Sequence, residues 1–273
     1  MSVVPGGASR AELLEAVDRH QWELAVRWAA VQGGDVHDTP GFVRCINPGV
    51  NVPFANGVMR VRLSEEELPH AVRECTAAFR EAGVPALWWT NPLSRPEDPG
   101  PDLRAHGWRA DEGMPWMAAA IHRIEWPDRP VRLRIERVTG EALQDAWLQG
   151  MTAGFSMTPV ERFAMTNLAT AVGYGEDAPW VRWVGFVDGR PVATSGLMQG
   201  GGVAGIYNVA TAPDARRRGF GAAMTAEAVR AGRERGYEVA VLGASDLGRG
   251  VYERMGFAEV CCEQVFLWPG PAR

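Results

Sequence analysis

The sequence predicts an α+β fold in which mixed, mostly antiparallel sheets are flanked by helices. Segments with helical spacing of apolar residues are interspersed with short strand-like segments along the whole chain. In the second half, an Asp188-Gly189 turn joins two apolar segments, 180–187 and 190–199, and this is the strongest hairpin signal in the sequence. Together these observations predict a mixed sheet.

Length and composition limit the class of protein. The chain has 273 residues, is 46% hydrophobic and carries a net charge of −5, so it can form two modest domains, each with its own core. The acidic balance argues against nucleic acid as a partner, so any anion site must be local. No apolar segment approaches the length of a membrane span, and the N-terminus lacks a signal-peptide pattern. We therefore expect a cytoplasmic protein, and the arginine-rich, lysine-free composition suggests a GC-rich bacterial genome.

The cysteines and histidines give no metal-binding pattern. The four cysteines, Cys45, Cys75, Cys261 and Cys262, lack paired metal-ligand spacing, and the last two should point to opposite faces of a strand. The five histidines have no partner at ligand spacing. We expect four buried thiols in a reducing compartment and no metal.

Two capping boxes open the helices of the first half. Ser9 with Glu12 begins one helix, and Ser64 with Glu67 begins another that stops at Gly83. Strands are predicted at residues 58–63, 85–90 and 114–121, with a proline-rich loop at 91–102 and a short helical piece at 103–108. Residues 125–130 have the composition of a linker, which predicts an N-terminal domain over 1–126.

Residues 131–273 are predicted to form a second domain. It opens with an alternating strand that places Val131, Leu133 and Ile135 inward. Thr158 with Glu161 forms a third capping box. Beyond the hairpin, strands are predicted at 203–212, 237–245 and 259–268, and helices are predicted at 141–151, 219–235 and 248–257.

One turn in this half has an unusual composition for the start of a helix. The sequence VATAPDARRRGFG places three arginines and two glycines between a strand and a helix, where a simple turn needs one glycine and a helix start favours acidic residues. Gly219 and Gly221 would let a phosphate approach the unpaired N–H groups of the helix, and Arg216, Arg217 and Arg218 add positive charge. The spacing matches neither G-x-x-x-x-G-K-[ST] nor G-x-G-x-x-G. A solvated basic turn is the alternative interpretation.

The turn does match R-x-x-G-x-G, and with it residues 131–273 resemble the GNAT superfamily of acetyl-coenzyme A dependent N-acyltransferases. The second signature of that family, a strand, a polar residue and a helix with Tyr before Gly-Phe, matches residues 239–257 with Ser245 and Tyr252. The resemblance implies acetyl-CoA as cosubstrate, with its pyrophosphate on the turn and its pantetheine arm along the preceding strand. The implied coenzyme-binding residues are Val209, Thr211, Arg216, Arg217, Arg218, Gly219, Phe220, Gly221, Ala222 and Ser245.

The chemistry that the resemblance implies is direct attack of a neutral amine on the thioester carbonyl. Tyr252 is the candidate acid for the leaving sulfur, and the backbone N–H of Val209 is a candidate to polarise the carbonyl oxygen. Glu161, Tyr207 and Asn208 are candidates to line the acceptor site, although the capping box already explains Glu161. The strand before the turn contains no acid or histidine, so no general base is assigned.

The first half resembles a degenerate copy of the same unit. Residues 85–121 repeat the order strand, loop, helix, Gly-aromatic pair and strand, with Leu103 in the place of Tyr252 and no R-x-x-G-x-G turn. We expect this half to lack coenzyme binding; an unrelated cap is the rival interpretation. Its tryptophans are expected mainly to fill a core. These are Trp22, Trp28, Trp88, Trp89, Trp108 and Trp116.

The leading hypothesis is an acetyl-CoA-dependent N-acetyltransferase that acts on a primary amine of a small molecule. Two alternatives remain: a non-catalytic acyl-CoA sensor, and a GNAT-like S-acyltransferase or decarboxylase. The sequence does not identify the acceptor, because acceptor specificity depends on loops such as residues 154–163 and on the cleft between the halves, where the sequence gives residue types without positions. We expect a monomer or homodimer with no membrane partner.

Overall fold

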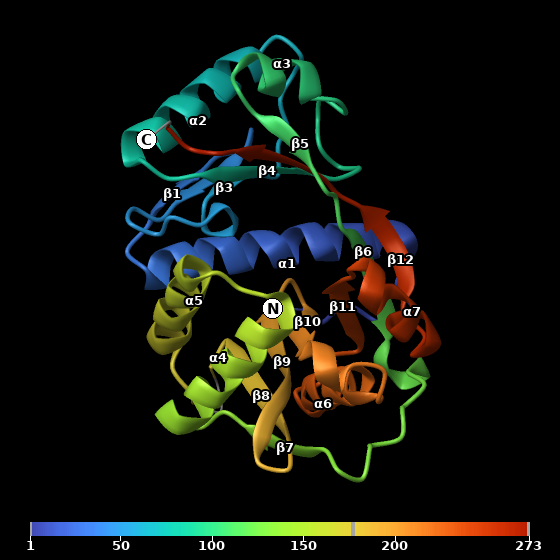
Figure 1. Cartoon of the computed structure of the whole chain (residues 1–273). Helices are drawn as coiled ribbons and strands as arrows, with labels where there is room; N and C mark the ends of the chain where they lie inside the picture. The colour runs from blue at the N-terminus through green and yellow to red at the C-terminus, as the bar shows by residue number, and fades with distance from the viewer. Residues whose placement is uncertain (1, 176–177, 272–273) are drawn as a thin grey trace. The chain divides into compact units, whose positions relative to one another are not determined.

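The computed structural model describes residues 2–175 and 178–271, and its contacts divide the chain into two compact units (Figure 1). One unit combines Met1–His20 with Pro115–Val260, and the other combines Gln21–Met114 with Cys261–Arg273. They are called the seven-stranded unit and the six-stranded unit here, after their sheets. The domain prediction, 1–126 and 131–273, concerned two segments of the sequence that resemble each other. It remains a prediction, because each contact unit contains residues from both segments. The outermost residues of those domains, Met1, Ala272 and Arg273, lie outside the described part.

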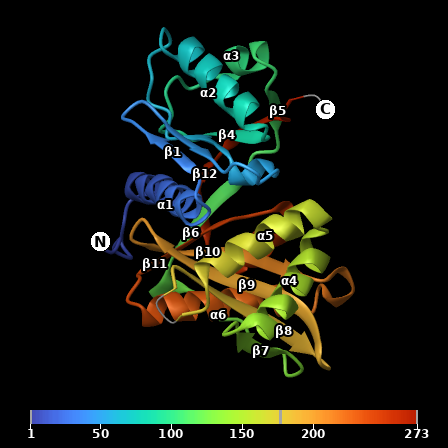
Figure 2. The same cartoon turned by 90° about the vertical axis from the view of Figure 1, so that its left-hand side faces the viewer.

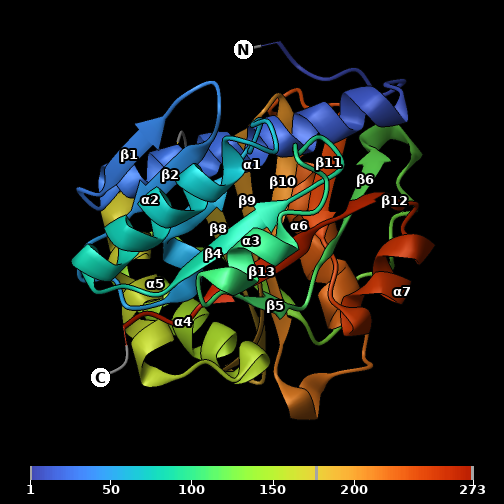
Figure 3. The ribbon, with the colours of Figure 1, turned by 90° about the horizontal axis from the view of Figure 1, so that it is seen from above.

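The six-stranded unit contains a mixed sheet in the order β1-β2-β3-β4-β13-β5 (Figure 3). Its strands are β1 (Asp35–Asp38), β2 (Val43–Ile46), β3 (Gly57–Met59), β4 (Ala86–Thr90), β5 (Arg109–Asp111) and β13 (Gln264–Trp268). Its helices are α2 (Leu68–Ala82), α3 (Gly100–Ala105) and the 3-10 turn η1 (Pro53–Ala55), and α1 (Arg10–Val31) enters it from the other unit. The core gathers on α2 and includes Phe79, Trp88 and Trp108.

The seven-stranded unit contains a mixed sheet in the order β12-β6-β11-β10-β9-β8-β7. Its strands are β6 (Pro115–Ala120), β7 (Arg134–Arg137), β8 (Trp180–Val187), β9 (Arg190–Gly200), β10 (Val203–Thr211), β11 (Val239–Gly243) and β12 (Ala258–Cys262). Its helices are α4 (Glu141–Phe155), α5 (Pro159–Val172), α6 (Phe220–Glu234) and α7 (Asp246–Arg254), with 3-10 turns η2 (Ile121–Arg123) and η3 (Pro213–Ala215). Within this unit, α4 and α6 cover opposite faces of the sheet (Figure 2).

The two sheets share one topology over four neighbouring strands. In each sheet, one of these strands comes from the other half of the sequence: β6 in the seven-stranded sheet and β13 in the six-stranded sheet. The order β3-β4-β13-β5 in one sheet corresponds to β10-β11-β6-β12 in the other, and the pairs β3-β4 and β10-β11 are both parallel. The prediction of a single strand over residues 259–268 is therefore wrong, because this segment forms two strands, β12 and β13. The chain leaves the seven-stranded sheet after Cys262 and enters the six-stranded sheet at Gln264.

The capping predictions are confirmed by hydrogen bonds. Ser9, Ser64 and Thr158 each exchange bonds with the glutamate three residues on. The Ser64–Glu67 pair closes a turn just before α2, which begins at Leu68. The Asp188-Gly189 hairpin is confirmed too, with φ values of 51° and 80° at these two residues.

Three local predictions are wrong. The strand predicted over 58–63 ends at Met59, because Arg60 adopts a positive φ of 54° that interrupts an extended segment. Val131 is fully exposed rather than inward, since β7 begins only at Arg134. Cys262 is exposed rather than buried, because it follows the buried Cys261 in β12 and successive side chains of a strand point to opposite faces.

The tryptophans of the first half divide by burial. Trp88, Trp108 and Trp116 are buried in the core, whereas the others are only partly buried. Trp116 lies on β6 and so belongs to the seven-stranded sheet. In the part of the chain that the structure describes, no helix has the length and apolar character needed to cross a bilayer.

Candidate active site

The site begins where two neighbouring strands of the seven-stranded sheet separate. The parallel strands β10 and β11 are paired at Ala204 and Gly205, and the pairing does not continue toward Thr211. On its other edge, β10 carries one extra residue between Tyr207 and Ala210, and Asn208 in this bulge has a φ of 54°. Strands that part in the middle of a sheet leave backbone N–H and C=O groups available to an extended ligand.

The arginine and glycine turn connects the end of β10 to α6. Gly219 is the N-cap of α6 with a φ of 78°, a conformation that glycine adopts without strain, and no side chain caps the helix. The first N–H groups of α6 are therefore available, and they coincide with the positive end of the helix dipole. A Cβ added at Gly221 would have only Thr211 Oγ1 nearby, at 3.7 Å, so there is open space in front of this helix terminus.

The three arginines of the turn have three different environments. Arg216 donates to the carbonyl oxygens of Thr211 (3.2 Å) and Gly154 (3.0 Å), and so ties the turn to the end of α4. Arg218 donates to the Asp214 carbonyl at 3.3 Å. Arg217 makes no side-chain hydrogen bond to the described residues, which leaves its guanidinium available to an anion.

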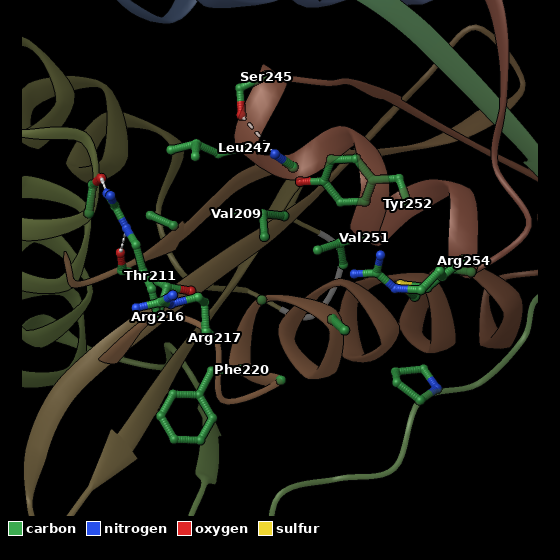
Figure 4. Close-up of a pocket in the computed structure, with 18 of the residues that line it drawn as sticks. Val209, Thr211, Arg216, Arg217, Phe220, Ser245, Leu247, Val251, Tyr252 and Arg254 are labelled. Atoms are coloured by element: carbon green, nitrogen blue, oxygen red, sulfur yellow. Dashed lines mark hydrogen bonds between the residues drawn. The ribbon is translucent and has the colours of Figure 1, made fainter. Parts of the chain in front are cut away.

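A cavity of about 1070 Å³ brings the predicted residues together (Figure 4). Nine of the ten predicted coenzyme-binding residues line it, as does Tyr252; Arg218 is the exception. The volume is slightly above the usual range for ligand and cofactor sites, roughly 300–1,000 Å³. The cavity therefore extends from the turn, along β10, to the helix that carries the predicted acid.

Sequence reasoning missed one segment that lines this cavity, Glu125, Trp126 and Pro127, because it had the composition of a linker. Gly154, Phe155 and Ser156, at the end of α4, also line it, and they begin the loop 154–163 that the sequence marked as a determinant of acceptor specificity. Arg254 was missed as well, although it lies one turn after Val251, another lining residue on the same helix.

Tyr252 is held in one orientation by its neighbours. Its side chain is 7% exposed, and its ring packs edge-on against Phe257 at 6.1 Å between centroids. Gly248, one turn earlier, leaves room for that ring, because a Cβ there would lie 2.8 Å from the Tyr252 Cε2 atom. Burial raises the pKa of Tyr252 to about 12, although a hydrogen bond with Thr225 acts in the opposite direction. The phenol is consequently protonated at neutral pH.

Ser245 is both a lining residue and the N-cap of α7. Its Oγ accepts a hydrogen bond from the Gly248 N–H at 3.3 Å. The hydroxyl hydrogen is not used by that bond, so Ser245 can still donate to a ligand.

The three acceptor-site candidates do not line the cavity. Glu161 is engaged in its capping box with Thr158. Tyr207 contacts the rings of His20 and Trp116, at 5.7 and 6.1 Å between centroids. Among the described residues that line the cavity, Glu125 is the one acid, and it comes from outside the strand where the sequence lacked one.

The chain belongs to the acetyltransferase (GNAT) family, whose model matches residues 119–257. The match begins within β6, consistent with the place of that strand in the seven-stranded sheet. A search of curated proteins gave no match.

Solved structures are similar over nearly the whole chain. A GCN5-related N-acetyltransferase from Kribbella flavida has 21% identity and a TM-score of 0.70, over 91% of this chain and 96% of that one. One from Sphaerobacter thermophilus has 15% identity and a TM-score of 0.62, over 97% and 95%. A tandem GNAT protein from the clavulanic acid biosynthesis pathway has 11% identity and a TM-score of 0.58, over 100% and 99%. These likenesses establish a tandem GNAT-like fold.

Proposed function

We propose that the protein is an acetyl-CoA-dependent N-acetyltransferase that acetylates a primary amine of a small molecule. The observation that carries the proposal is the single cavity lined by both the arginine and glycine turn and Tyr252. Family membership supports the reaction class. The chemical character of the lining residues supports the coenzyme, because one end offers helix N–H groups with Arg217 and the remainder follows the separated edge of β10.

In the proposed reaction, the amine nitrogen attacks the thioester carbonyl carbon, the carbon–sulfur bond breaks, and the amine loses one proton. A backbone N–H at the β10 bulge, with Val209 as the candidate, would stabilise the negative charge that develops on the carbonyl oxygen. No covalent bond to the protein is needed. The proton that leaves the amine balances the charge of the departing thiolate.

Tyr252 would act on the departing sulfur as a hydrogen-bond donor. Its pKa of about 12 is above the value of about 8.5 for a thiol, so the phenol keeps its proton in the resting state. A phenol of this kind stabilises a thiolate through a charge-assisted hydrogen bond and can pass a proton to it only as another proton arrives.

Calorimetric titration of acetyl-CoA into three forms of the protein tests the coenzyme proposal. Native protein and Gly221→Ala should both bind, because a methyl group fits the open space at this position. Gly221→Glu should lose binding, because its carboxylate would occupy and repel the phosphate site. Absence of binding to native protein, or equal binding by all three forms, would show that the turn is only a basic turn.

A thiol-release assay with a panel of small amines then separates the enzyme from the alternatives. Release that depends on the amine supports the N-acetyltransferase. Binding without release with any amine would favour the acyl-CoA sensor, and release that depends on an acceptor thiol would favour an S-acyltransferase. Loss of carbon dioxide from an acyl chain would identify a decarboxylase.

A further inference from the structure

The bulge in β10 lies at the cavity wall, and its peptide groups are outside the regular ladder of the sheet. Asn208 and Val209 lie together opposite Ser195 of β9. Val209 lines the cavity, between Thr211 and Tyr252 (Figure 4). Because a bulge interrupts the ladder, contacts other than regular strand pairing must fix the orientation of its peptide groups.

The side chain of Thr194, on β9, supplies such a contact. Thr194 is fully buried, and its hydroxyl donates to the Asn208 carbonyl oxygen at 2.7 Å. Its methyl group packs against α4, because a Cβ added at Gly150 would lie 2.8 Å from the Thr194 Cγ2 atom. The hydroxyl and the methyl group of this side chain therefore have separate partners, the bulge and the helix.

The Asn208 carbonyl and the Val209 N–H belong to one planar peptide group. This peptide bond is trans, so the carbonyl and the N–H point in opposite directions. Since β10 lies between β9 and β11, a carbonyl held toward β9 turns the Val209 N–H toward β11. The pairing of β10 with β11 ends at Gly205, so this N–H faces the gap between the separated strands.

We propose that Thr194 is a positioning residue for acetyl transfer, because its hydroxyl fixes the peptide group that presents the Val209 N–H to the thioester carbonyl. This inference rests on the proposed function, in which that N–H is the candidate donor. Thr194 does not line the cavity, so it acts through the peptide group and not on the ligand. A donor that stabilises a developing negative charge must be aligned in advance, since hydrogen bonds weaken steeply with misalignment.

Two substitutions separate the hydroxyl of Thr194 from its methyl group. Thr194→Ser keeps the donor and loses the methyl, so it should unfold at a lower denaturant concentration but keep kcat within about twofold of native. Thr194→Val keeps the methyl and puts a second one in place of the hydroxyl. A methyl carbon lies about 3.3 Å or more from a carbonyl oxygen and cannot occupy the 2.7 Å position, so the peptide group must turn or shift.

Steady-state kinetics with the amine that the release assay identifies measures the consequence. In Thr194→Val, kcat should fall at least tenfold, a part of the roughly 100-fold loss expected when such a donor is removed. The Kd for acetyl-CoA should stay within about threefold of native. Thr166→Val is the matched control, because the Thr166 hydroxyl also donates at 2.7 Å to a carbonyl, that of Arg162 within α5, and this variant should keep native kcat.

The alternative explanation is that Thr194 only fills space beneath α4. This alternative predicts that kcat follows stability, so that Thr194→Ser, which leaves a space at the methyl position, is impaired at least as much as Thr194→Val. Thr194→Ser with reduced stability and native turnover would exclude it.

Nuclear magnetic resonance of protein labelled with ¹⁵N-valine observes the Val209 amide without any acceptor amine. In native protein the Val209 amide proton should shift further downfield with acetyl-CoA than with CoA, because only acetyl-CoA carries the thioester carbonyl. Thr194→Ser should keep this difference, and Thr194→Val should lose it. The resonance is assigned by its absence from Val209→Ile.

The outcomes distinguish this inference from the proposed function. Native kcat in Thr194→Val, or an acetyl-dependent Val209 shift that persists in that variant, overturns the positioning role of Thr194. Equal Val209 shifts with acetyl-CoA and CoA in native protein also overturn it and leave the coenzyme site standing. Failure of native protein to bind acetyl-CoA overturns the proposed function itself.

Discussion

The two units place helices of the same length after corresponding strands, but the helices begin with opposite charges. In the seven-stranded unit, α6 has 15 residues and follows the sequence RRRGFG, with no side-chain cap. In the six-stranded unit, α2 also has 15 residues and follows Ser64 and three glutamates. The Ser64 N–H donates to the Glu67 carboxylate at 2.8 Å and lowers its pKa, so carboxylate charge occupies that terminus. One terminus can accept a phosphate, and the other repels it.

The strand pairs beside these helices also differ: β3 and β4 stay in close contact, whereas β10 and β11 separate. A Cβ at Gly57 of β3 would collide with the Leu87 carbonyl of β4 and with the Trp89 ring, so these two backbones lie in close contact. The position that corresponds to Tyr252 is Leu103, which is fully buried with Trp88 and Trp108. In the seven-stranded unit β10 and β11 part, and Tyr252 faces a cavity. The comparison teaches that one topology can be filled as a core or left open as a site.

The largest effect should come from emptying the filled position. Leu103→Ala removes a fully buried side chain and should lower the free energy of unfolding of the six-stranded unit by about 3 kcal/mol. Denaturant unfolding followed by tryptophan fluorescence measures this, with Leu247→Ala, an exposed position, expected within about 0.5 kcal/mol of native. The affinity of Leu103→Ala for acetyl-CoA should be unchanged, because Leu103 does not line the cavity. Loss of coenzyme binding in Leu103→Ala would argue that the filled unit also serves the site.

The corresponding change in the open unit should affect turnover. Tyr252→Phe keeps the buried ring and its contact with Phe257 but removes the hydroxyl, so kcat should fall on the order of 100-fold. The dissociation constant for acetyl-CoA should stay within about threefold of native, because the phenol contributes to the leaving step. A variant with native turnover would remove Tyr252 from the mechanism.

The burial of Tyr252 also predicts that the free energy of unfolding depends on pH, and Tyr252→Phe can isolate the contribution of this residue. The pKa of Tyr252 is about 12 in the folded state and about 10 in an unfolded chain. The unfolded chain therefore loses this proton first, and the stability due to the buried phenol, full below pH 10, is lost as the pH rises to about 12. The loss should reach at most about 3 kcal/mol.

Denaturant unfolding at pH 9 to 12 measures this effect as a difference between proteins. Burial also raises the pKa of the Cys45 and Cys75 thiols to about 12, so native protein and Tyr252→Phe should both lose stability in this range. Native protein should lose more, by the amount due to the tyrosine. Parallel curves would show that the Tyr252 phenol is accessible to solvent.

Local sequence signals predicted the helix starts, the hairpin and the arginine and glycine turn. They could not predict that β6 and β13 each join the sheet of the other half of the sequence. The capping boxes and the Asp188-Gly189 turn depend on residues a few positions apart, and all are confirmed. By contrast, β12 and β13 form one continuous strand-like segment, and only their partners in two sheets separate them. Most of the predicted coenzyme residues meet in one cavity because the motif is contiguous. Trp126, by contrast, belongs to a segment far from the motif in the sequence, and the hydrogen bond from the Glu125 N–H to the Met255 carbonyl holds that segment beside the end of α7.

The smallest predicted effect concerns the space that orients Tyr252. A Cβ at Gly248 would lie 2.8 Å from the Tyr252 ring, closer than such atoms approach, so Gly248→Ala must displace the ring and should lower kcat about tenfold. Gly250→Ala is the matched control, because it makes the same change on the same helix and its Cβ would meet only Arg254 Nη1, at 3.5 Å. Gly250→Ala should keep native turnover, and steady-state kinetics compares the two. Equal activities in both variants would mean that the reaction does not depend on the orientation of the Tyr252 ring. The functional difference between the two units would then lie in the charge at the start of α6 and of α2.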